Sequence, residues 1–107
     1  MSNKLANRTK VKVEVEVESR EKYIFQLFVA GLLPNSVRAI ENINAICEQH
    51  LEGRFELEVI DIYQQPSLAI TQQIIAIPVL IKKFPLPEER LIGDLSNTDR
   101  VLKALHL

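Results

Sequence analysis

Few residues of this sequence have the types and spacings suited to catalysis or metal binding. Cys47 is the single cysteine, which excludes an internal disulfide and a zinc site built from several cysteines. It falls on the apolar side of an expected helix, so we interpret it as a small buried side chain rather than a reactive thiol. His50 and His106 lie far apart, without a cysteine or carboxylate at ligand spacing. We therefore predict that the protein is not an enzyme and holds no metal or other cofactor.

The composition is typical of a globular protein, with 47% apolar and 25% charged residues among 107. This length suits one domain with one core. The 13 basic and 14 acidic residues give a net charge of −1, which disfavours nucleic-acid binding. The first ten residues lack the apolar stretch of a signal peptide, and the apolar run at 74–81 is too short to span a membrane. We expect a soluble, cytoplasmic protein that binds neither nucleic acid nor membrane.

An alternation of apolar and charged residues predicts a strand near the N-terminus. Val11, Val13, Val15 and Val17 alternate with lysine and glutamate, a pattern typical of a half-exposed strand. We expect this strand to lie at a sheet edge. There it either folds back as a hairpin on the strand that follows or pairs with another chain.

The remainder of the sequence alternates strand and helix patterns. Apolar runs predict strands over 23–30, 55–62, 79–84 and 90–92. Helical spacing of apolar residues predicts a long helix after the first of these strands, a short helix over 66–75 and a last helix near the C-terminus. The order βαβαββα predicts an α/β protein with a thioredoxin-like core, preceded by the extra N-terminal strand.

Residues at the expected helix ends match the chemistry of helix caps. Asn35 is expected to be the N-cap of the long helix, and Gly53 its C′ residue. Ser96 or Asn97 is expected to cap the last helix.

The turn before the long helix decides whether redox chemistry is expected. In thioredoxin-like redox enzymes this turn carries a Cys-x-x-Cys pair, whose thiolate the helix N-terminus stabilises. Here the turn reads GLLPNS, without a cysteine, and we interpret Ser36 as a capping residue. Redox catalysis of that kind is therefore disfavoured.

Several segments together resemble one family, the KaiB circadian-clock proteins. These segments are FVAG at 28–31, PNSVRA at 34–39, VID at 59–61, Pro66 followed by LA at 68–69, AIPVL at 76–80, PLP at 85–87 and IGDLS at 92–96. The resemblance identifies residues 23–107 as a KaiB-like domain. Residues 1–22 are then an N-terminal extension that contains the predicted edge strand.

The resemblance implies a regulator rather than an enzyme. KaiB proteins bind the ATPase KaiC and through it help to sequester KaiA. They also switch fold, because a ground state of order βαββααβ, which tends to be tetrameric, converts into the thioredoxin-like monomer that binds KaiC. We therefore expect a homo-oligomer, either a dimer or a tetramer, and a rearrangement from about Gln64 onwards.

Three residues occupy positions that resemble those influencing this fold equilibrium. They are Tyr23, Gly93 and Asp94. Gly93 can adopt a positive φ that other residues resist, and Asp94 can cap the helix that follows.

For this function we expect a partner-binding surface around the start of the long helix, the third of the expected core strands and the turn after it. Its residues are Asn35, Arg38, Pro78, Lys82, Pro85, Pro87 and Arg90. In thioredoxin-like folds the peptide bond at the position of Pro78 is usually cis and shapes the partner-facing surface. The alternative function is a diverged thioredoxin-like module, fixed in one fold, that binds another partner such as a sensor kinase or a stress-response protein.

Overall fold

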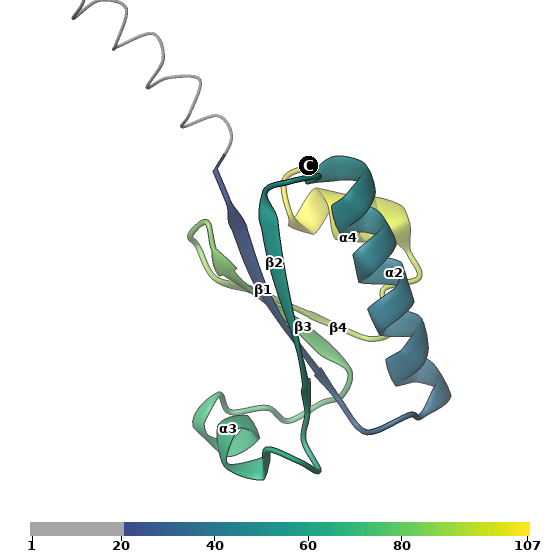
Figure 1. The fold of residues 1–107 in the computed structure, drawn as a ribbon, viewed down its shortest axis with the longest axis vertical. Helices are drawn as coiled ribbons and strands as arrows, with labels where there is room; N and C mark the ends of the chain where they lie inside the picture. Colours follow the sequence, from purple (N-terminus) through teal and green to yellow (C-terminus); the bar gives the residue numbers. More distant parts are fainter. Residues whose placement is uncertain (1–20) are drawn as a thin grey trace, which may run out of the picture.

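The computed structural model describes residues 21–107, which form a four-stranded sheet with helices on both faces (Figure 1). The predicted strand over residues 11–17 lies outside the described residues. The elements are β1 (Tyr23–Val29), α2 (Pro34–His50), β2 (Phe55–Asp61), α3 (Pro66–Thr71), β3 (Val79–Phe84), β4 (Glu89–Ile92) and α4 (Thr98–Ala104). Their order confirms the predicted βαβαββα arrangement.

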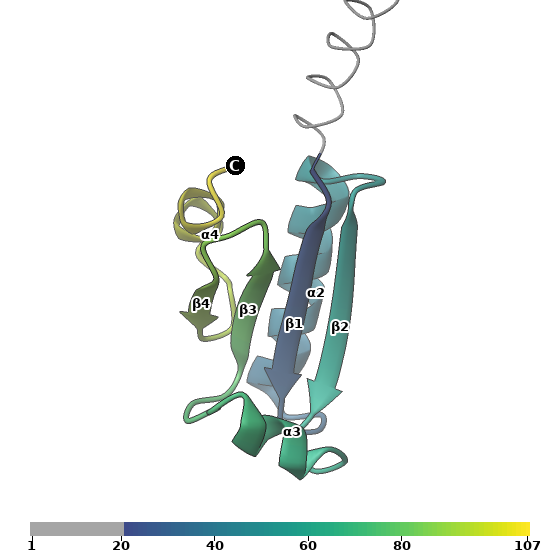
Figure 2. The ribbon, with the colours of Figure 1, turned by 90° about the vertical axis from the view of Figure 1, so that its left-hand side faces the viewer.

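β1 lies in the interior of the sheet, whose strand order is β2-β1-β3-β4 (Figure 2). It runs parallel to β2 and antiparallel to β3, and β3 is antiparallel to β4. Since both edges of β1 are paired, neither is open to a further strand. The predicted pairing of residues 11–17, either as a hairpin with the following strand or with another chain, lies outside the described residues and stays a prediction.

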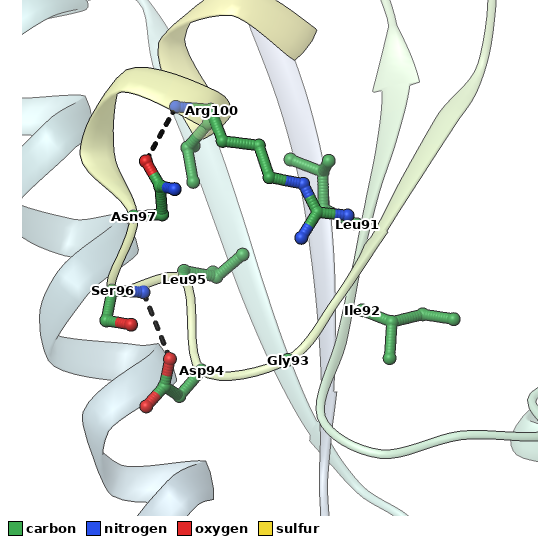
Figure 3. Close-up of a pocket in the computed structure, with 9 residues that line it drawn as sticks. Leu91, Ile92, Gly93, Asp94, Leu95, Ser96, Asn97 and Arg100 are labelled. Carbon is green, nitrogen blue, oxygen red and sulfur yellow. Dashed lines mark hydrogen bonds between the residues drawn. The ribbon is translucent and has the colours of Figure 1, made fainter.

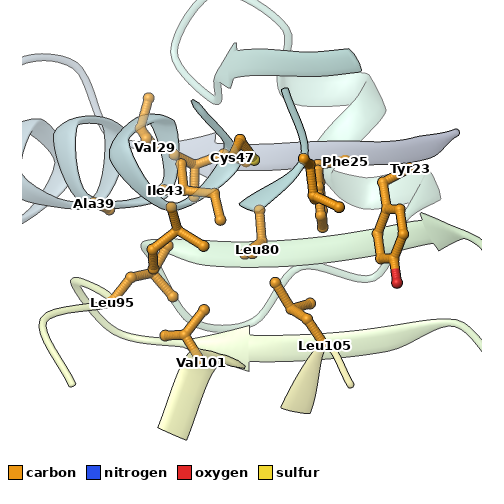
Figure 4. Close-up of a cluster of buried hydrophobic side chains, with 13 residues drawn as sticks. Tyr23, Phe25, Val29, Ala39, Ile43, Cys47, Leu80, Leu95, Val101 and Leu105 are labelled. Carbon is orange, nitrogen blue, oxygen red and sulfur yellow. The ribbon is translucent and has the colours of Figure 1, made fainter. Parts of the chain in front are cut away.

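The larger apolar core lies between the sheet and helices α2 and α4 (Figure 4). Alternate residues of β1 face it, because successive side chains of a strand point to opposite faces. Its fully or nearly fully buried members are Phe25, Leu27, Val29, Ala39, Ile43, Ile46, Cys47, Leu51, Leu80, Leu95, Val101 and Leu105. The α2 members recur at helical spacing, as the sequence predicts.

A smaller core lies on the opposite face, at the end of the sheet that α3 covers (Figure 2). It consists of Phe28, Ile60, Val79 and Ile81, with Leu68 and Ala69 of α3 packed against them. Because α3 has only six residues, it leaves the other end of this face uncovered. Ile24 and Phe84, which are neighbours in the β1–β3 register, are exposed there.

Helix α2 begins two residues earlier than predicted. Pro34 occupies its first turn and Leu33 is the N-cap residue, so the prediction that Asn35 is the N-cap is wrong. Ser36 is not a cap either, because its buried hydroxyl accepts a hydrogen bond from the Ala30 amide at 3.1 Å. At the other end of the helix the C-cap residue is Leu51. Gly53, the predicted C′ residue, lies two residues beyond this cap, with a φ of +76°.

Contacts at the ends of the two short helices define their bounds. Helix α3 stops at Thr71 rather than at residue 75, since Gln73 adopts a φ of +55°, and Arg90 binds the carbonyl oxygens of Gln72 and Gln73 at 2.7 and 3.3 Å. Helix α4 is capped by Asn97, whose side chain accepts a hydrogen bond from the Arg100 amide at 3.1 Å, which selects one of the two predicted caps. Among residues 21–107, no helix has the length and apolar character needed to cross a membrane.

Replacing Ile43 with alanine tests the larger core. Ile43→Ala is expected to lower the free energy of unfolding by about 2–5 kcal/mol, because apolar contacts are lost and a cavity remains. Ile70→Ala is the matched control, since Ile70 is 78% exposed, and it is expected to change this energy by less than about 0.5 kcal/mol. Urea unfolding followed by circular dichroism measures both variants, and equal effects would contradict the assigned core.

Candidate functional site

The turn from β1 into α2 is ordered and carries an apolar surface. Gly31 has a φ of +57°, a conformation that favours glycine. The Asp61 carboxylate at the end of β2 accepts hydrogen bonds from the amides of Gly31 at 3.2 Å and Tyr63 at 2.9 Å. Leu32 and Leu33 protrude from the turn and are 88% and 52% exposed. Two adjacent large apolar side chains on this turn offer apolar area that a partner can bury.

The Asp94 carboxylate joins the loop between β4 and α4 to helix α2. Its Oδ2 accepts a hydrogen bond from Arg38 Nε at 3.1 Å, and its backbone carbonyl accepts one from Asn42 Nδ2 at 2.8 Å. Its Oδ1 accepts one from the Ser96 amide at 3.1 Å (Figure 3). Hydrogen bonds from the Ser96 side chain, then from Arg38 and the Ser96 amide, lower the pKa of Asp94 below its ordinary value of 3.8. The prediction that Asp94 caps the following helix is wrong, because Asn97 does so.

Gly93 joins the same loop to the start of β3. Its amide donates a hydrogen bond to the Pro78 carbonyl at 2.9 Å, and its φ of +115° is one that other residues resist. Pro78 is buried, and the Ile77–Pro78 peptide bond is cis, as is usual in thioredoxin-like folds. Loops beside β1, β3 and β4 therefore meet at one end of the sheet. They bring Arg38, Pro78, Gly93 and Asp94 together, and we call this region the binding end.

The other predicted surface residues lie elsewhere. Pro85, Pro87 and Arg90 lie on or beside the β3–β4 hairpin, whose tip is at the opposite end of the sheet from Pro78. Lys82, in β3, is 2% exposed, so the prediction that its side chain lies on a surface is wrong. The predicted surface is therefore divided between the two ends of the sheet.

Two groups of residues at the binding end were missed by sequence reasoning. Leu32 and Leu33 carry a signal in the sequence, since they stand between Gly31 and Pro34, outside any expected strand or helix. The sequence gives no signal for Asn42, because its contact with the Asp94 carbonyl depends on the packing of two segments that are distant in the sequence.

A cavity of about 180 Å³ lies between β4, the loop after it and α4 (Figure 3). Its lining runs from Leu91 to Asn97 and includes Arg100 and Val101. Its walls combine apolar side chains such as Leu91 and Leu95 with the polar groups of Asp94, Ser96, Asn97 and Arg100. Within residues 21–107, no three histidine, cysteine, aspartate or glutamate side chains are placed to hold a metal ion.

The side chains of Cys47 and Tyr23 are buried in the larger core. Burial, with a smaller contribution from the charge of Glu48, raises the pKa of Cys47 to about 12. The thiol therefore stays protonated at neutral pH, which confirms Cys47 as a buried side chain. The Tyr23 ring lies 5.9 Å from that of Phe25, and the Arg54 guanidinium stacks over it at 5.8 Å.

Comparison with known sequences identifies the family. The sequence model of the KaiB domain matches residues 26–107. The chain belongs to the KaiB family. The circadian clock oscillator protein KaiB of Thermostichus vulcanus is 47% identical over 88 residues, which cover 82% of each chain. The KaiB of Nostoc punctiforme is 44% identical over 91 residues, which cover 85% of this chain and 88% of the relative. The family resemblance seen in the sequence is thus confirmed, and it is a family of circadian-clock proteins.

Comparison with solved structures confirms the thioredoxin-like fold. The N-terminal domain of SasA from Synechococcus elongatus matches with a TM-score of 0.58 and 28% identity, over 80% of this chain and 85% of that domain. Chloroplastic thioredoxin z matches with a TM-score of 0.62 and 19% identity, over 90% of this chain and 89% of the other. Of the two arrangements predicted for a KaiB protein, this structure has the thioredoxin-like one.

Replacing Arg38 with alanine tests the contact that joins the loop to α2. In Arg38→Ala we expect the pKa of Asp94 to rise towards 3.8, because a hydrogen bond and a positive charge that favour the carboxylate are removed. The lowered pKa also means that Asp94 stabilises the fold above about pH 3.8, and that this contribution is lost as the pH falls through the folded-state pKa. NMR titration of the side-chain carboxyl measures the shift. Arg54→Ala, beside Tyr23, is the control and should leave it unchanged, whereas no change in Arg38→Ala would contradict the contact.

Proposed function

We propose that this KaiB-family protein is a non-enzymatic regulator that binds a KaiC-type ATPase, in a circadian clock or a related signalling system. Through that ATPase it would help to sequester KaiA. The observation that carries the proposal is the turn between β1 and α2, which presents Leu32 and Leu33 where redox enzymes of this fold carry cysteines. Family membership supports the choice of partner, since the relatives are circadian clock oscillator proteins.

Each part of the binding end has a role in this proposal. The two exposed leucines supply apolar area that the partner buries. Arg38 keeps a half-exposed guanidinium beside Asp94, from which it can donate further hydrogen bonds to a carboxylate of the partner. Asn35 lies in the first turn of the same helix and offers an amide, while Pro78 shapes the backbone beneath.

The hairpin supplies the second contact region of the proposal. Pro85 and Pro87 restrict the turn between β3 and β4, so that little conformational freedom would be lost on binding. Arg90 contributes charge at its base, where it also pairs with Glu88 at 3.8 Å. A partner that contacts both ends of the sheet would have to span its length.

The proposal includes a fold switch and a homo-oligomer, either a dimer or a tetramer. We infer that the thioredoxin-like state binds the partner and that a second state has the order βαββααβ. The distribution of packing supports this: helix α3 buries none of its residues and α4 buries one, whereas α2 buries five. Segments with little buried area open at low free energy, so the half of the chain after about Gln64 is the part expected to rearrange.

Loss of the two exposed leucines tests the binding end. Leu32→Asp/Leu33→Asp is expected to weaken binding to a KaiC-type hexamer in ATP at least about tenfold, because apolar anchors are replaced by charges. An aspartate at position 33 suits a helix N-cap, so the fold should persist. The control Ile70→Asp changes an exposed residue of α3 and should leave binding unchanged. Biolayer interferometry measures both variants, and equal affinities would contradict this surface.

Replacing Gly93 with alanine tests the fold equilibrium. Nothing lies within 4 Å of the added Cβ, so the cost of Gly93→Ala comes from its φ of +115° and is expected to exceed about 1 kcal/mol. The thioredoxin-like state should therefore become less populated, with a change in size and in far-UV circular dichroism. Gly53→Ala has a comparable φ of +76°, but it precedes the half expected to rearrange. If both variants lose only stability, the domain is fixed in one fold.

A second candidate function is a thioredoxin-like module that remains in one fold and binds a different partner, such as a sensor kinase or a stress-response protein. The similarity to the N-terminal domain of SasA favours it, because that solved domain has the same fold at 28% identity. Absence of binding to a KaiC-type hexamer at high protein concentration would favour this candidate. A pull-down from the native cell would then identify the partner.

A further inference from the structure

The outer edge of β2 is an unpartnered edge of the sheet. β2 pairs with β1 on one side, and no strand among residues 21–107 pairs with the other side. All seven residues of β2 are in regular register with β1, so the free edge is long and straight, whereas β4 at the opposite edge has four residues. An edge of this length is a template for an added strand.

The side chains of β2 divide into an acidic row and an apolar row. Glu56 and Glu58 are exposed and lie on the face of α3. Glu56 accepts a hydrogen bond from Lys22 at 3.0 Å, and Glu58 accepts one from Gln26 at 3.1 Å. On the other face, Phe55 and Leu57 pack only partly against the larger core, and Val59 is 42% exposed.

The acidic row disfavours pairing with the β2 strand of another copy. Antiparallel pairing centred on Leu57 would place Glu56 opposite Glu58 of the second copy, and like charges in that position are destabilising. The edge instead favours a strand that alternates basic and apolar residues, with the basic ones opposite the glutamates.

We propose that the free edge of β2 binds residues 10–13 of a second copy of this chain as an antiparallel strand. In the sequence, this segment reads KVKV. One register places Lys10 opposite Glu58 and Lys12 opposite Glu56, which gives two pairs of opposite charge on the same face. Each glutamate retains a free carboxylate oxygen for such a pair beyond its contact with Lys22 or Gln26.

The same register also matches the apolar rows. It places Val11 opposite Leu57 and Val13 opposite Phe55, on the face that α2 covers. The added valines would cover the flanks of two side chains that the larger core leaves partly exposed.

Other registers are less favourable. A shift by one residue would place lysines beside apolar residues and valines beside glutamates. A shift by two residues brings like charges together, either Lys12 with Arg54 or Glu14 with Glu56. The charges of the two strands therefore select a single antiparallel register.

The topology favours a segment from another copy over the chain's own. β1 begins at Tyr23, and β2 lies between it and the free edge. A segment that precedes β1 would have to cross the start of β2, where the chain arrives from α2, and crossing connections are avoided in sheets. A second copy meets no such obstacle, and two copies can exchange these segments about a two-fold axis.

A charge exchange in the full-length chain tests this proposal. By sedimentation velocity in low salt, Lys10→Glu/Lys12→Glu is expected to raise the dimer dissociation constant at least about tenfold. Glu56→Lys/Glu58→Lys should do the same, and the quadruple variant should return to within about threefold of the parent. The control Glu41→Lys/Glu48→Lys makes the same charge change as Glu56→Lys/Glu58→Lys, but on exposed positions of α2. It should change the dimer dissociation constant by less than about threefold.

Several outcomes would overturn the proposal. They are a parent that stays monomeric up to about millimolar concentration, an edge variant without effect, or a quadruple variant without rescue. Rescue of Lys10→Glu/Lys12→Glu by Glu14→Lys/Glu16→Lys instead would show that the N-terminal segments pair with each other. Circular dichroism checks each fold, and where the double reversal does not fold, Lys10→Glu with Glu58→Lys provides the same exchange.

Discussion

β1 pairs along its whole length with β2 on one side and, past an irregularity near Ile24, with β3 on the other. Most of its side chains are buried, with Phe25 and Leu27 directed towards α2 and α4, and Phe28 towards α3. A parallel partner requires a crossover connection, so the β1–β2 pair requires α2 to pack on the sheet. The remaining elements of the described chain extend or cover the sheet that this strand organises.

The binding end follows from where β1 stops. The turn after Val29 is fixed by Asp61 from the parallel neighbour, while the antiparallel neighbour begins at Val79, directly after Pro78. The Arg38–Asp94 contact then joins the loop after β4 to the first turns of α2. Where thioredoxin-like redox enzymes carry cysteines, this turn positions two exposed leucines, which the proposed function assigns to contact with a partner.

Local patterns were sufficient to predict the strands, their order along the chain and the buried position of Cys47. Apolar periodicity is a property of neighbouring residues, so it can be recognised in the sequence. Features that depend on distant residues were not predictable. Helix α3 ends early at the positive φ of Gln73, where Arg90, far along the chain, binds carbonyl groups beyond its last turn. Ser36 resembles a cap in the sequence, but its hydroxyl satisfies the Ala30 amide inside the fold. Lysine is a residue type usually found at a surface, yet Lys82 lies on an interior strand of the sheet and its side chain is buried.

The central claim is that the thioredoxin-like state binds its partner through the end of the sheet where β1 stops. Hydrogen–deuterium exchange of the full-length chain, with and without a KaiC-type hexamer in ATP, measures this most directly. We expect the partner to slow exchange in residues 31–38 and 92–97, while β1 and β2 remain protected in both states. Protection confined to other segments, or loss of protection in β1 on binding, would contradict the claim.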